Sequence, residues 1–248
     1  MSLASALLEP PPSLQNLPLI GWLFSSIGKK TVVALTGVAL VFFVIGHLLG
    51  NFTLFLGPDY INAYALKLHS LGPLLWVIRA GLLGIVVLHI YFTMLLWVEN
   101  RKARPQKYAV FAPMTTTVFA RTMRFTGLIV LAFVVFHLAH FTAHLIDPSY
   151  SKLRTQLDGH EVMDVYRMVI IGFSNPFVSA FYIFSLFLLA FHLSHGISSL
   201  FQTLGVTNKT LRPLCELGAR AVAWLLFLGY ASIPVSILVF GLGKDSLK

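Results

Sequence analysis

Long apolar runs separated by short polar stretches dominate the chain. A helix needs about 20 apolar residues to cross a bilayer, and five runs reach that length. They cover residues 31–56, 74–98, 120–146, 175–204 and 217–241. A shorter apolar segment at 14–27 fits either an interfacial or re-entrant segment or a plain surface arm. The stretch 158–170, between the third and fourth runs, has the length of a short helix on the membrane surface. The pattern predicts one all-α membrane domain over residues 1–248, with a four-helix bundle and a fifth helix.

Composition agrees with this pattern. The chain is 57% hydrophobic and 11% charged, with a mean hydropathy of +0.81, whereas soluble domains carry roughly a quarter charged residues. Its net charge of +9 lies mostly in short loops, which is typical of a membrane protein and does not indicate a nucleic-acid partner. Cys215 is the only cysteine, so a disulfide, an iron–sulfur cluster, a thiolate zinc site and covalently attached haem are excluded within the chain.

Basic residues cluster on one side of the predicted helices. The loops that carry them contain Lys29, Lys30, Arg101, Lys102, Arg104, Lys107, Arg121, Arg124, Lys209, Arg212 and Arg220. The alternate loops are poorer in Lys and Arg or balance them with acidic residues. By the positive-inside rule, we expect a cytoplasmic N-terminus and an external C-terminus.

Four histidines, His47, His89, His137 and His192, lie inside four different apolar runs. A histidine in hydrocarbon is costly unless it is paired, so each marks a candidate functional site. His47 and His137 lie 17 and 16 residues beyond the basic residues that start their helices. His89 and His192 each lie ten residues before the polar end of a helix running the other way. At 1.5 Å per residue, they form an outer and an inner pair separated by roughly 10 Å.

Paired histidines between membrane helices are typical ligands of haem iron. We therefore expect two haems, with His47 and His137 on the outer one and His89 and His192 on the inner one. Two histidines on each iron leave no open position, which favours electron transfer over oxygen binding.

Several polar residues near these positions have open roles. His140 and His195 each follow a predicted ligand by one helical turn, so either member of each pair could bind iron. If they are not ligands, His140, His144 and His195 are candidates for contact with haem propionates, quinone or water. Arg79 fits either snorkelling to headgroups or pairing with an outer propionate. Lys29 and Arg124 fit inner propionates, an acidic partner subunit or plain topogenic charge.

The order of several motifs resembles a known family. The motifs are Ser26-Ile27-Gly28-Lys29-Lys30, Thr36-Gly37, Gly46-His47-Leu48-Leu49-Gly50-Asn51, Asn62-Ala63-Tyr64, His89-Ile90-Tyr91, Asn100-Arg101-Lys102-Ala103-Arg104-Pro105, Arg121-Thr122-Met123, Phe136-His137-Leu138, Phe191-His192-Leu193-Ser194-His195-Gly196 and Ser199-Leu200-Phe201-Gln202-Thr203-Leu204-Gly205. From Ser26 to the fifth run, the chain resembles the single-chain di-haem cytochrome b anchor of succinate dehydrogenase and fumarate reductase.

The resemblance implies a bacterial cytoplasmic-membrane subunit with two haem b groups and the same histidine pairs. It also implies electron exchange with menaquinone or a related quinone, and separate flavoprotein and iron–sulfur subunits that carry the dicarboxylate chemistry. The chain departs from some family members in one respect: it has no Asp or Glu between Arg79 and Glu99 or between Asn175 and Gln202. That puts a carboxylate proton path within those helices in doubt.

The quinone site does not transfer residue by residue. The candidates are Asp59, Tyr60, His140 and His144 on the outer side, and Ser26, Lys29, Arg124 and His195 on the inner side. Two other functions fit the same histidines: a di-haem anchor of a hydrogenase, formate dehydrogenase or nitrate reductase, and a haem-free transporter or channel with a histidine proton relay.

Overall fold

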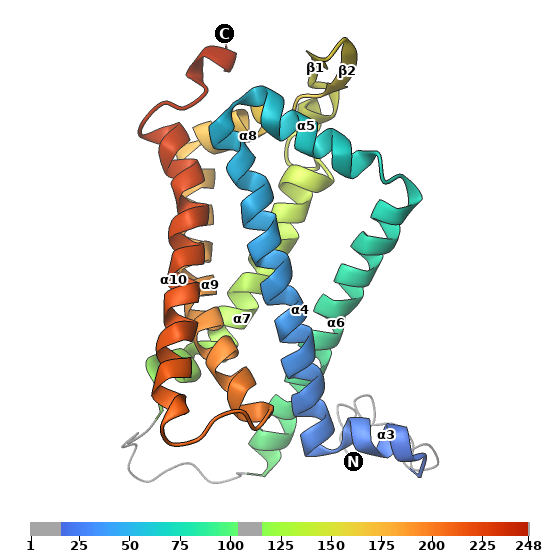
Figure 1. Cartoon of the computed structure of the whole chain (residues 1–248), viewed down its shortest axis with the longest axis vertical. Coiled ribbons are helices and arrows are strands. Elements are labelled where there is room, and N and C mark those ends of the chain that lie inside the picture. The colour runs from blue at the N-terminus through green and yellow to red at the C-terminus, as the bar shows by residue number, and fades with distance from the viewer. Residues whose placement is uncertain (1–15, 104–115, 248) are drawn as a thin grey trace.

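Five long helices form the body of the protein (Figure 1). The computed structural model describes residues 16–103 and 116–247. The long helices are α4 (Ser26–Phe52), α6 (Pro73–Lys102), α7 (Val118–His137), α9 (Pro176–Thr203) and α10 (Leu211–Leu238). A 3₁₀ turn at Thr53–Leu56 continues α4, and a π-helical turn at Leu138–Thr142 continues α7. The structure is 82% helical, and all five helices are long and apolar enough to cross a membrane. The predicted all-α membrane fold is confirmed.

The packing order of the helices decides which of them face each other. The most extensive contacts join α9 to α10, α4 to α6 and α7 to α9, followed by α4 with α9. The order α6–α4–α9–α7 therefore puts α4 diagonally opposite α7, and α6 diagonally opposite α9. Neighbours run antiparallel, with α4 and α7 rising and α6 and α9 descending in Figure 1. Helix α10 packs outside this group, mainly on α9.

Local sequence signals explain where the helices begin. The Asn175 side chain accepts hydrogen bonds from the Phe177 and Val178 amides, and Pro176 follows at the first position of α9, where its missing N–H costs nothing. The Ser25 side chain accepts from the Gly28 amide at the start of α4. Gly72, with φ of 52°, makes the turn into α6, a backbone conformation that side-chain-bearing residues rarely adopt.

Short elements lie at both ends of the bundle. Helix α3 (Pro18–Phe24) projects sideways from the start of α4 and has no buried residue (Figure 1). The part of the 14–27 segment that the structure describes is thus helical and does not pack into the bundle. The opposite end carries α5 (Pro58–His69), 3₁₀ turns at Pro148–Lys152 and Lys244–Leu247, strands β1 (Arg154–Leu157) and β2 (His160–Met163), and α8 (Val165–Ser174). We call the two ends the α3 end and the α8 end.

Two features of the α8 end differ from the sequence prediction. The stretch 158–170 is not a single surface helix, because its first part belongs to the β1–β2 hairpin and the helix begins only at Val165. Most of α8 is buried, packed against α5, α9 and α10. Helix α5 was not predicted, because its twelve residues are shorter than a membrane span and only Ile61 and Asn62 are buried.

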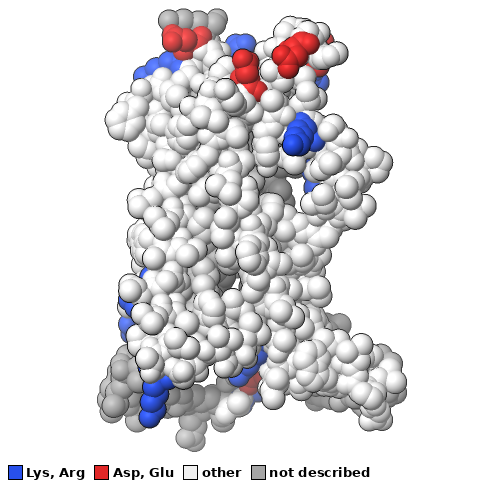
Figure 2. Space-filling model, viewed as in Figure 1, with Lys and Arg blue, Asp and Glu red and all other residues white. Residues whose placement is uncertain are grey.

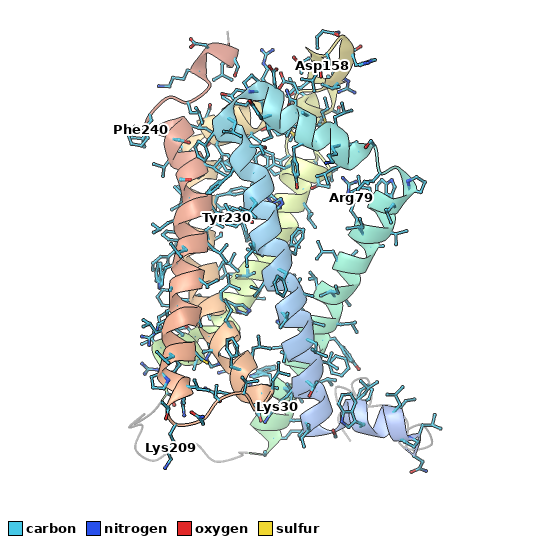
Figure 3. The ribbon with its side chains drawn as sticks, in the orientation of Figure 1. Lys30, Arg79, Asp158, Lys209, Tyr230 and Phe240 are labelled. Carbon is cyan, nitrogen blue, oxygen red and sulfur yellow. The ribbon has the colours of Figure 1, made fainter. Side chains whose placement is uncertain are left out.

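Charged side chains are concentrated at the two ends, and a broad uncharged band lies between them (Figure 2). Large apolar side chains such as Phe42, Leu83 and Leu128 are exposed on the long helices. In water such a surface would be unstable, but it suits contact with lipid tails. The chain is therefore a multi-pass membrane protein. Lys30 and Lys209 lie at the α3 end, and Asp158 lies at the α8 end (Figure 3).

Candidate functional site: two histidine pairs

His47 and His137 meet in the half of the bundle nearer the α8 end. Their ring centroids are 5.8 Å apart with an interplanar angle of 80°. They come from the diagonal helices α4 and α7, so the contact crosses the interior of the bundle. Phe43, one turn before His47, stacks on its ring at 5.4 Å. The predicted outer pair is brought together.

The nitrogen atoms of these two rings differ in their partners. His137 Nδ1 lies 3.3 Å from the Tyr182 hydroxyl of α9, which leaves Nε2 without a hydrogen bond among the described residues. Neither nitrogen of His47 has a hydrogen-bond partner in that part of the chain. Tyr230 of α10 lies beside His47, with ring centroids 6.1 Å apart, but its hydroxyl donates to the Val44 carbonyl at 2.6 Å. Figure 3 shows Tyr230 where α10 faces α4.

The inner pair has a repeated environment. The His89 ring of α6 packs on Gly37 of α4, and the His192 ring of α9 packs on Gly127 of α7. A Cβ atom at Gly37 would lie 3.5 Å from His89 Cε1, and one at Gly127 would lie 3.3 Å from His192 Cε1. The glycines therefore give each imidazole room against the neighbouring helix.

Each inner ring also lies beside a backbone carbonyl one turn before the glycine. His89 lies beside that of Val33, and His192 beside that of Met123. His89 Nδ1 also lies 3.0 Å from Thr36 Oγ1. Thr36 directs its hydroxyl hydrogen to helix carbonyls at 2.7 or 3.1 Å, so it accepts from Nδ1–H. His192 Nδ1 is buried near the Met123 carbonyl but completes no hydrogen bond of normal geometry. Both Nδ1 atoms face the adjacent helix, so Nε2 is the ring nitrogen left for a ligand.

The two pairs lie at different depths. Gly37 marks the level of His89 on α4, and His47 follows ten residues later. Gly127 marks the level of His192 on α7, and His137 also follows ten residues later. At 1.5 Å per residue, each interval is about 15 Å, somewhat larger than the roughly 10 Å expected from the loops. The structure therefore has the two histidine layers that the sequence predicts.

The residues present fit haem better than a bare metal ion. No group of three or more His, Cys, Asp or Glu side chains gathers within the described ranges to hold an ion. The His47 and His137 rings, 5.8 Å apart, meet edge to face as aromatic rings commonly do, so their distance alone does not identify a ligand. The fit to haem rests on the Nε2 atoms, which have no hydrogen bond among the described residues, and on the glycines that give the inner rings room.

His140 has a different position from His137. It is 2% exposed, and both of its ring nitrogens have tyrosine partners: Nδ1 lies 3.1 Å from the Tyr182 hydroxyl and Nε2 lies 3.3 Å from the Tyr150 hydroxyl. Because no nitrogen of His140 is left over, the geometry favours His137 as the iron ligand. Burial raises the pKa of Tyr150 and nearby Asp147 raises it further, so this phenol keeps its proton.

The other candidate histidines lie nearer the ends of the bundle. His144 has a φ of 53° just after the π-helical turn, and its ring meets Tyr150 edge to face at 6.0 Å. His195 is half-buried one turn beyond His192. Both remain candidates for quinone or propionate contact.

Three basic candidates have aromatic or acidic neighbours. The Arg79 guanidinium lies over the Trp76 ring at 5.0 Å, near the α8 end of α6 (Figure 3). The Arg124 guanidinium lies 5.7 Å from the Trp97 ring centroid. Lys29 is buried and pairs with Glu99 at the α3 end.

These neighbours decide which basic residues are able to bind an anion. Cation–π contact leaves the N–H groups of Arg79 and Arg124 able to meet an anion. Lys29 already has its counter-ion, so a propionate or partner carboxylate would compete with Glu99. Asp59, Tyr60 and Ser26, the other quinone candidates, are exposed at helix starts and do not join the histidine pairs.

Sequence reasoning missed the partners of the histidines. Tyr182 touches His137 and His140 from 45 and 42 residues away, and Tyr150 reaches His140 from a 3₁₀ turn. A buried tyrosine needs a partner for its hydroxyl, and Tyr182 in an apolar run was the available signal.

Comparisons of this sequence and structure with protein-family models, curated proteins and solved structures yield no match.

Proposed function

We propose that the chain is the di-haem cytochrome b anchor of a succinate:quinone oxidoreductase. It would carry electrons between an iron–sulfur partner subunit and a membrane quinone such as menaquinone. The observation that carries the proposal is that four intramembrane histidines from four helices of one bundle lie at two depths, with the ring centroids of the outer pair 5.8 Å apart. The motif resemblance supplies the choice among quinone-linked complexes.

Each part of the site has a defined task in this proposal. His47 and His137 would hold the outer haem b, and His89 and His192 the inner one. The Tyr182 and Thr36 oxygens orient two of the imidazoles through Nδ1, as outer-shell acceptors do for metal-bound histidines. Gly37 and Gly127 give the inner rings room against the neighbouring helices, and Nε2 of each ring would bind the iron. Bound haem iron supplies one-electron transfer.

The ends of the bundle would meet different partners. The basic loops favour a cytoplasmic α3 end in the bacterial cytoplasmic membrane, where the iron–sulfur subunit would dock and the flavoprotein subunit would carry the succinate and fumarate chemistry. The quinone would bind near either layer, beside the candidate His144 or beside His195 and Arg124, since both ring nitrogens of His140 are already paired with tyrosines. Apolar side chains of α8, α9 and α10 form a buried cluster around Tyr182, next to His137 of the outer layer.

The proposal is tested by purifying the chain with its natural partners. We expect a dithionite-reducible b-type absorption band, two haems per chain, and co-purifying flavin-containing and iron–sulfur subunits. Two haems with a hydrogenase, formate dehydrogenase or nitrate reductase instead would contradict the assigned complex and keep the cytochrome. A preparation without a reducible b-type band would refute the haem proposal and favour the transporter with a histidine relay.

A further inference from the structure

A hydrogen-bonded chain runs from His137 away from the bundle interior. The Tyr182 hydroxyl lies 3.3 Å from His137 Nδ1 and 3.1 Å from His140 Nδ1, and His140 Nε2 lies 3.3 Å from the Tyr150 hydroxyl. Tyr182, His140 and Tyr150 are between 2% and 4% exposed. Because polar groups are costly to bury singly, a cluster of this kind persists when each member satisfies the next.

The donors and acceptors of this chain permit two directions. In the first, His137 Nδ1–H donates to Tyr182, the Tyr182 hydroxyl donates to His140 Nδ1, and His140 Nε2–H donates to Tyr150. In the second, every donor and acceptor is reversed, and the neutral His137 then carries its hydrogen on Nε2. Only the first leaves a lone pair on Nε2 of His137, the atom that a metal ion requires.

We propose that Tyr182, His140 and Tyr150 are positioning residues that fix the Nε2-ligating tautomer of His137 and lower the reduction potential of the outer haem. The inference rests on the proposed function. An acceptor on Nδ1–H makes an imidazole a more basic ligand, which stabilises ferric over ferrous iron. A chain of hydrogen bonds polarises its members, so the Tyr182 oxygen accepts more strongly than an isolated phenol.

The other proposed iron ligands have no comparable series of hydrogen bonds. His89 has acceptors within the neighbouring helix only, the Thr36 hydroxyl and the Val33 carbonyl, while His47 has no hydrogen-bond partner among the described residues. The Tyr182–His140–Tyr150 hydrogen bonds therefore act only on the outer haem, through His137. His140 gains a purpose that its burial beside a candidate ligand otherwise leaves unexplained.

The test is a redox titration of the two b-type absorption bands in the purified complex, with Tyr182→Phe as the perturbation. The outer haem is identified as the one lost in His47→Ala. We expect Y182F to keep two haems and raise the midpoint potential of the outer haem while the inner potential stays unchanged. Tyr150→Phe removes the far end without touching His137 and should raise the same potential by a smaller amount.

Tyr230→Phe is the matched control. Its ring is 6.1 Å from the ring of His47, as the Tyr182 ring is 6.0 Å from that of His137, but its hydroxyl serves a backbone carbonyl. We expect Y230F to leave both potentials at wild-type values.

Any other outcome counts against the proposed role of the Tyr182–His140–Tyr150 hydrogen bonds. An unchanged or lowered outer potential in Y182F, or an equal rise in Y230F, overturns it. If Y182F does not assemble, Y150F decides, and an unchanged outer potential there overturns it. Two haems with unshifted potentials refute only the role of these hydrogen bonds, whereas absence of haem refutes the proposed function as well.

Discussion

Replacing Gly127 by leucine should remove the inner haem and leave the outer one. A Cβ at this position would lie 3.3 Å from His192 Cε1, tighter than ordinary van der Waals contact, and the rest of a leucine side chain adds further crowding. Overpacking of this kind costs about 1–3 kcal/mol. If the full cost falls on haem binding, the affinity drops about 5- to 150-fold, since 1.4 kcal/mol is a factor of ten.

Global stability is a poor measure of this effect. Replacing a helical glycine gains up to about 1 kcal/mol of helix propensity, which offsets part of the crowding. The assay is therefore haem content per chain together with the midpoint potentials of the haems that remain. Gly84→Leu is the control, because a Cβ there meets nothing within 4 Å.

The two glycines also give a graded comparison. A Cβ at Gly37 would lie 3.5 Å from His89 Cε1, so Gly37→Ala should retain full haem content while Gly127→Ala shows a measurable loss. A Gly127→Leu protein with two haems at unchanged potentials would refute the assignment of His192 as a ligand packed on this glycine.

Three further predictions follow from the same geometry. Replacing His47 or His137 by alanine should leave one haem per chain, the inner one; loss of both haems or of neither, measured as haem content, contradicts the pairing. His140→Ala should keep two haems, because both nitrogens of His140 already bind tyrosines; a missing haem would instead make His140 the ligand. Lys29→Met should lower the free energy of unfolding by about 2 kcal/mol, measured by thermal unfolding in detergent. This figure lies between the ion-pair energies of exposed and buried pairs, because the Glu99 side chain is 31% exposed and that of Lys29 only 5%. Adding Glu99→Gln should restore part of that loss, and equal stabilities of all the variants would show that the pair contributes nothing.

The start of α4 shows where sequence reasoning reached its limit. The sequence prediction began this helix at residue 31 because Lys29 and Lys30 are polar. In the structure the helix begins at Ser26, since Ser25 caps it and Lys29 forms an ion pair with Glu99. The β1–β2 hairpin and α5 were missed for a related reason: the hairpin packs on α5 and α5 packs on α8, and neither segment has a repeating apolar pattern of its own. The depth argument, by contrast, predicted that His47 and His137 lie at one level, and the structure brings their ring centroids to 5.8 Å.

By itself the sequence determined the five membrane-spanning helices, their alternating direction and the two levels of histidine, since each depends only on apolar length and on a rise of 1.5 Å per residue. Only the tertiary structure decided which helices lie on the diagonals, which glycine faces each inner imidazole, and that Tyr182 joins His137 to His140. The physical reason is that these contacts link residues far apart in the chain, and hydrophobic periodicity says which face of a helix is apolar but not which helix packs against it.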